Sequence, residues 1–188
     1  FPYTPRFRSN PKLIKEGMLM ARRKSWEAYE RIKPLLTEGM TEPEARKVAL
    51  AVFADMGVVM KKHWHQPFIR FGEGTKQTFH QPMRAEGRLA KGDIVHMDLG
   101  PIFADEETGI EYEGDVGDSF IFGEASDNPE GERCVQAVRT LFNEGKVLWQ
   151  QGKTGKEIYA HIEKRAVEMG YQYYDHVVGH RVGDFPHQ

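Results

Sequence analysis

The stretches GMTEPE at residues 39–44 and GKTGKE at residues 152–157 carry one shared pattern, and this pattern decides the fold. In each, a threonine is followed three residues later by a glutamate, which is typical of a capping box and predicts the start of a helix. Each pattern continues for the same distance to a Met-Gly pair, at residues 56–57 and 169–170. Glycine at that place predicts the end of the helix.

The surroundings of the two patterns also match. A long helix is expected before each one, over residues 11–34 and 129–151, and a strand that leads to histidines after each one, over residues 58–71 and 171–178. A chance match between two capped helices is the alternative. A duplicated helix-helix-strand unit instead predicts an α+β fold, in which two units pack their strands into one curved sheet with the helices on one face.

Composition indicates a single domain over residues 11–188, behind an N-terminal arm of residues 1–10. The chain has 188 residues and a net charge of -2, which gives no support to nucleic-acid binding. No stretch approaches the 18 apolar residues of a membrane span. The lone Cys134 allows no intrachain disulfide, and no secretory signal is visible, so we expect a cytoplasmic protein. The oligomeric state stays open, a homodimer included.

Two aspartates flank a predicted hairpin. Asp98 ends a short strand over residues 94–99, and Asp115 opens the return strand after an acidic excursion with its tip at residues 108–109. Adjacent antiparallel strands would bring these carboxylates side by side, where they repel unless a cation lies between them. With one imidazole, they suit Mn, Fe, Co or Zn. The alternative is that both are turn residues beside Gly100 and Gly114.

Histidines supply the other candidate ligands. Three fall in the last thirteen residues, at spacings of four and seven: His176, His180 and His187. Imidazole is the commonest metal-binding side chain near neutral pH. His80 lies on a loop before the strand at residues 94–99, and His65 follows Trp64 in the first histidine-bearing strand. The alternative is a polar tail with incidental histidines. His96 is expected to be a satisfied polar group, and His161 to face solvent.

The order of these motifs resembles the pita-bread metallopeptidases, a family that includes methionine aminopeptidase, Xaa-Pro aminopeptidase, prolidase and creatinase. The pattern consists of His80, GDIVHMDLG at residues 92–100, GDVGDSFIFG at residues 114–123 and HVVGHRVGDFPH at residues 176–187. The resemblance covers residues 11–188 and implies the pita-bread fold, an internally duplicated and mainly antiparallel α+β architecture. The histidine four residues before His180 is most similar to the Xaa-Pro aminopeptidase and prolidase branch.

This resemblance implies a metal-dependent hydrolase that cleaves a peptide C–N bond with a water activated by two divalent metal ions. Asp98 would bind one metal, Asp115 would bridge the two, and His180 would bind the second. The metals would be Mn, Co, Zn or Fe, and the substrate a peptide or small amide.

The resemblance also assigns histidines to the substrate. His80 and His187 would be catalytic, holding the substrate and stabilising the tetrahedral intermediate. His176 would contact the substrate near the scissile bond, and His65 is a further substrate-binding candidate.

Departures from the family pattern leave two other functions open. The family carries two glutamates beyond the last histidine, and this chain ends at Gln188 before either, so we expect the domain to lack its C-terminal strands. Gly117 and Asp118 stand where the peptidase branch often has Thr and Arg. One alternative is a creatinase-like amidinohydrolase with a small non-peptide substrate. The other is a non-catalytic binding module on the same fold.

Overall fold

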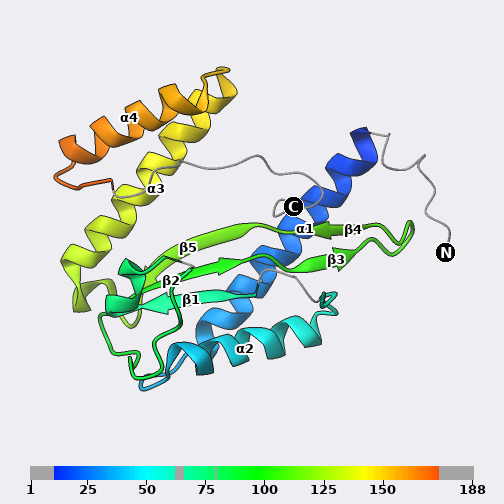
Figure 1. The fold of residues 1–188 in the computed structure, drawn as a ribbon, viewed down its shortest axis with the longest axis horizontal. Helices are drawn as coiled ribbons and strands as arrows, with labels where there is room; N and C mark the ends of the chain where they lie inside the picture. The colour runs from blue at the N-terminus through cyan, green and yellow to red at the C-terminus, as the bar shows by residue number, and fades with distance from the viewer. Residues whose placement is uncertain (1–10, 62–65, 79, 174–188) are drawn as a thin grey trace.

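A layer of antiparallel strands, backed by long helices, forms the body of the molecule in this computed structural model, which describes residues 11–61, 66–78 and 80–173 (Figure 1). In chain order the elements are α1 (Pro11–Ile32), the 3₁₀ helix η1 (Lys33–Leu35), α2 (Glu42–Asp55), β1 (Phe68–Phe71), η2 (Gly72–Lys76), β2 (Ile94–Leu99), β3 (Ile102–Ala104), β4 (Glu111–Glu113), β5 (Val116–Ile121), η3 (Ala125–Asp127), α3 (Pro129–Gln150) and α4 (Gly155–Glu168). The predicted arm of residues 1–10 lies outside the described residues.

One long hairpin forms the centre of the sheet. The strands β1, β2 and β5 pair antiparallel in that order, and β3 pairs with β4. Leu99 lies opposite Val116 and Ile102 opposite Glu113, so two residues lie between the two pairs on each strand and the register does not change between them. The β2–β3 and β4–β5 segments therefore form one continuous hairpin, and its connecting residues 105–110 include the predicted tip at residues 108–109.

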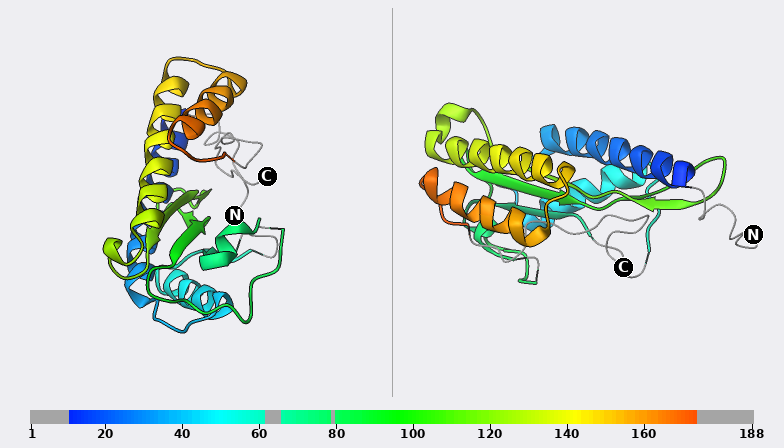
Figure 2. Two further views of the ribbon diagram at one scale, coloured as in Figure 1. Left: turned by 90° about the vertical axis from the view of Figure 1, so that its left-hand side faces the viewer. Right: turned by 90° about the horizontal axis from the view of Figure 1, so that it is seen from above.

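Helix α1 packs across one face of this hairpin. Figure 2 shows α1 and α3 along that face, with η2 projecting on the other side of the sheet. In β2, the fully buried residues Val95, Met97 and Leu99 alternate with half-buried ones, as expected for a strand with one face on the core. The approach of α1 is close: a Cβ on Gly17 would overlap the Tyr112 ring, and a Cβ on Gly114 would stand 1.9 Å from Ser25 Oγ.

The two helix pairs confirm the predicted repeat. Both α1 and α3 have 22 residues, and both α2 and α4 have 14. Thr41 and Thr154 each form a complete capping box with the glutamate three residues later. Because the box satisfies backbone groups at the helix start, the sequence alone identified both boundaries. The α+β architecture is as predicted.

Two strand predictions were too long. Among the described residues of the predicted strand over residues 58–71, only Phe68–Phe71 form a strand. Val59 instead donates a backbone hydrogen bond to Ile102 O at 2.8 Å, which docks its segment at the start of β3. Residues 62–65, including His65, lie outside the described residues. Residues 171–173 form no strand, and the rest of that prediction is also outside the described range. No helix in the described parts of the chain has the length and apolar character needed to span a bilayer.

We predict that Gly17→Ala destabilises the fold by about 1–3 kcal/mol, because the new methyl group would overlap the Tyr112 ring in a packed core. Gly145→Ala in α3 is the matched control. Its Cβ would make ordinary 3.6 Å contacts with Ile158 and Ile162, so it should raise the free energy of unfolding by up to about 1 kcal/mol. Urea denaturation measures both. Equal effects of the two substitutions would contradict the close approach of α1.

Candidate functional site

Asp98 lies on the sheet face that points away from α1. Its strand neighbours Met97 and Leu99 are buried against the core, so the alternation of the strand turns His96 and Asp98 to the other side. In the register, Asp98 is opposite Gly117 and His96 is opposite Ser119. We call the face that carries these four residues the site face.

Asp115 belongs to the same face. Tyr112 and Gly114 both direct their Cβ positions at α1, so the intervening Glu113 and the following Asp115 point the other way. The constant register places Asp115 across from Gly100 and therefore diagonal to Asp98. The next pair along the hairpin agrees with this register, because the Gly114 N–H donates to Pro101 O at 2.8 Å. Diagonal neighbours have Cβ atoms about 7–8 Å apart or less, within reach of one another's side chains through a shared ion.

A glycine lies directly across the hairpin from each of the two aspartates. Gly117 lies directly opposite Asp98, and Gly100 lies opposite Asp115. Neither glycine carries a side chain that could fill the space between the two carboxylates. The two positions across the hairpin from the carboxylates therefore add no side chain to the site face.

Asp118 has a different task. It pairs with Met97, which turns it toward α1 and α3, and Arg139 of α3 donates to both of its carboxylate oxygens at 2.8 and 3.2 Å. Burial, with the Asp118 charge nearby, raises the pKa of Tyr29 on α1 well above its usual range. Asp118 therefore lies within β5 and joins α3 to the sheet.

His96 is a satisfied structural group, as predicted. Its Nδ1 lies 3.0 Å from Ser119 Oγ, and its ring meets Phe68 edge to face at 6.2 Å between centroids. Burial lowers the pKa of the imidazole and favours its neutral form, against the smaller opposing influence of Asp98 and Asp118. His161, expected to face solvent, is instead half-buried and lies 2.7 Å from Glu144 of α3.

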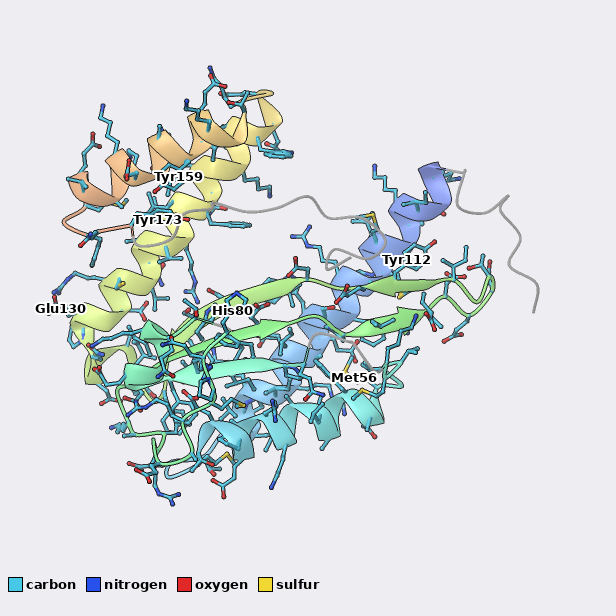
Figure 3. The ribbon with its side chains drawn as sticks, viewed as in Figure 1. Met56, His80, Tyr112, Glu130, Tyr159 and Tyr173 are labelled. Carbon is cyan, nitrogen blue, oxygen red and sulfur yellow. The ribbon has the colours of Figure 1, made fainter. Side chains whose placement is uncertain are left out.

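His80 lines a cavity of about 450 Å³ beside the site face. Phe68, which lies opposite Asp98 in the β1–β2 ladder, lines the same cavity as His80. Figure 3 looks onto the site face and labels His80 over the strands. A turn holds this histidine: Gln81 N–H donates to Thr78 O at 3.1 Å, and Thr78 N–H donates to Gln81 Oε1 at 2.9 Å.

A buried ion pair beneath this turn was not anticipated. Arg70 of β1 and Glu42 at the start of α2 are both 1 % exposed in their side chains and meet at 2.5 Å. A signal for it existed, because an arginine within the otherwise apolar strand FIRF must find a partner when the strand is buried. The partner lies 28 residues away in sequence, so no local pattern names it.

Two of the three predicted metal ligands, Asp98 and Asp115, lie among the described residues. Among residues 11–61, 66–78 and 80–173, no three His, Cys, Asp or Glu side chains gather as a metal-binding group. Asp98 and Asp115 supply two carboxylates, which fit a divalent cation in charge and donor type. The third predicted ligand, His180, lies outside the described residues. So do three substrate-contact candidates: His65, His176 and His187.

Comparison with known proteins gives the family and the fold. Residues 16–188 match the model of the family described as Metallopeptidase family M24. The prolidase from Pyrococcus horikoshii OT3 superposes with a TM-score of 0.71 at 19 % identity, over 95 % of this chain and 48 % of that one. The X-Pro aminopeptidase from Thermotoga maritima MSB8 gives 0.71 at 18 %, with the same coverage of 95 % and 48 %.

The methionine aminopeptidase from Thermotoga maritima gives a TM-score of 0.70 at 22 % identity, over 96 % of this chain and 70 % of that one. At these identities the structural likeness establishes the fold, and the pita-bread prediction is confirmed. This chain spans about half the length of the first two of these relatives. The curated proteins gave no match.

Proposed function

The chain belongs to the metallopeptidase family M24, and we propose that it acts as a metal-dependent hydrolase that cleaves a peptide C–N bond, of the aminopeptidase or Xaa-Pro dipeptidase type. The observation that carries this proposal is the pair Asp98 and Asp115, which share the site face and each lie across the hairpin from a glycine. Side chains in place of these two glycines would fill the space that bound ions need.

In this proposal Asp98 binds one divalent ion, Asp115 bridges two ions, and His180 binds the second. Mn, Co, Zn and Fe all accept this mixture of carboxylate oxygen and imidazole nitrogen. Two carboxylates that share one face repel each other, and the bound cations relieve that repulsion. When bound, the ions lower the pKa of a water and polarise the substrate carbonyl.

His80 and His187 are proposed to act on the substrate directly. His80 borders the cavity next to the site face, where an imidazole N–H can donate a hydrogen bond to the oxygen on which negative charge develops. Such a donor matters most in the transition state, because the carbonyl oxygen carries less charge before the attack. His176 is proposed to contact the substrate near the scissile bond, and His65 is a further proposed substrate-binding residue.

The cavity favours an apolar residue beside the cleaved bond. Its wall includes the apolar residues Pro67, Phe68, Pro82 and Met83, and polar residues such as Arg46 also line it. An apolar wall next to a few placed polar groups is the usual form of a small-ligand site. Proline is an apolar residue of suitable size, which supports the Xaa-Pro assignment within the proposed reaction class.

We predict that Asp115→Asn weakens Mn²⁺ binding by more than about 100-fold and abolishes turnover with it, because the substitution removes a charged ligand that both ions share. Asp118→Asn is the matched control, since Asp118 lies on the same strand but points to α3. It should leave Mn²⁺ affinity and turnover within about threefold and cost about 1 kcal/mol of stability.

Titration calorimetry with Mn²⁺ and a peptidase assay, both on the full-length protein, measure these effects. Full activity in Asp115→Asn would refute the assignment of this residue. Loss of Mn²⁺ binding in Asp118→Asn, with the fold intact, would show that the ion site lies on the other face.

A substrate panel tests the reaction class. We expect Xaa-Pro dipeptides and N-terminal peptides to be hydrolysed after addition of Mn²⁺, and EDTA to abolish that hydrolysis. Small guanidino compounds should be turned over at least about tenfold more slowly, because their binding would leave the apolar wall unfilled. Hydrolysis of the guanidino compounds alone would favour the amidinohydrolase alternative. Binding of peptides without hydrolysis, in the Mn²⁺-loaded protein, would favour the binding module.

A further inference from the structure

We propose that the buried Arg70–Glu42 pair positions His80, and that Arg70 is therefore a positioning residue of the active site. The proposal rests on the proposed function for the role of His80, but the geometry that supports it does not depend on activity. Arg70 lies opposite His96 in the β1–β2 ladder, so its side chain rises from the site face. It lines the same cavity as His80.

The guanidinium of Arg70 holds the segment that follows His80. Its Nη2 donates to Gln81 O at 2.6 Å, and its Nη1 donates to Pro82 O at 3.1 Å. Gln81 is also bonded to Thr78 through its backbone N–H and its side-chain carbonyl. Residue 80 therefore lies within the Thr78–Gln81 turn, and the guanidinium holds the two residues that follow it.

Glu42 anchors this guanidinium to α2. Its Oε2 accepts from Arg70 Nη1 at 2.5 Å and from the Arg84 N–H at 2.7 Å. Glu42 is the first residue of α2, where the helix dipole favours a carboxylate. One ion pair thus connects the start of α2, strand β1 and the loop of residues 81–84. The loop position is consequently tied to two rigid elements.

Stability alone does not account for this arrangement. A buried ion pair costs desolvation, and apolar residues of similar volume often stabilise a core at least as well. A planar guanidinium can serve two carbonyls and a carboxylate at once, which a lysine ammonium does less well. The arrangement therefore suits a task of positioning, since a misplacement of about 1 Å at a reacting group can cost about 100-fold in rate.

A substitution at Gly74 can disturb the Arg70–Glu42 pair without replacing either of its residues. A Cβ at residue 74 would stand 1.9 Å from Glu42 Oε1, so Gly74→Ala must displace the carboxylate while the residues Arg70 and His80 themselves stay unsubstituted. Gly87 is a matched control in the neighbouring loop. The three atoms nearest to a Cβ there belong to the Arg84 side chain, at ordinary distances of 3.5–3.6 Å.

The test uses the full-length protein with ¹⁵N-labelled histidine, loaded with Zn²⁺, which is diamagnetic. His80→Gln identifies the ring signals of His80. In Arg70→Lys and Gly74→Ala we expect these signals to shift or broaden, kcat to fall at least about tenfold, and KM and metal stoichiometry to stay within about twofold. Gly87→Ala should match the wild type in every measurement.

The readouts separate this inference from the proposed function. Shifted His80 signals with unchanged kcat would uphold the positioning and remove His80 from the reaction. Unshifted His80 signals in both variants, with only a lower melting temperature, would overturn the inference and leave a structural ion pair. If Arg70→Lys does not fold, Gly74→Ala still decides, because its substitution lies outside the pair. A protein inactive toward every peptide would still give the His80 signals.

Discussion

The constant register of the hairpin formed by β2–β3 and β4–β5 is the constraint on which the site depends. A shift of one residue would turn Asp98 into the core and expose Met97, because side chains alternate between the two faces of a strand. The packing of α1 fixes which face is which. Its close contacts through Gly17 and Ser25, with Tyr112 and Gly114, leave Asp115 on the side of Asp98. Core packing thus sets the position of the two carboxylates.

Three groups of charged residues around the sheet have different structural roles. Asp118 with Arg139 joins α3 to the helix-covered face, and Glu42 with Arg70 ties the His80 loop to α2 and β1. Asp98 and Asp115 share the site face with glycines as neighbours. In the Asp118 and Glu42 pairs a guanidinium neutralises the carboxylate. On the site face, Asp98 and Asp115 offer carboxylate oxygens, a donor type that divalent cations bind.

Local signals in the sequence predicted the parts of the fold that local interactions determine. The capping boxes at Thr41 and Thr154, the strand over residues 94–99 and the hairpin tip all depend on neighbouring residues, and all were predicted. The extent of a strand depends on pairing with distant residues, so residues 58–61 were wrongly assigned. The Arg70–Glu42 pair and the Asp118–Arg139 pair join segments 28 and 21 residues apart, beyond what periodicity indicates.

Anomalous X-ray diffraction at the manganese edge, from crystals of the full-length protein grown with Mn²⁺, shows directly whether the hairpin register makes Asp98 and Asp115 a metal site. We expect anomalous density between these two carboxylates, on the face away from α1. Density only at other residues, with this face empty at saturating Mn²⁺, would contradict it.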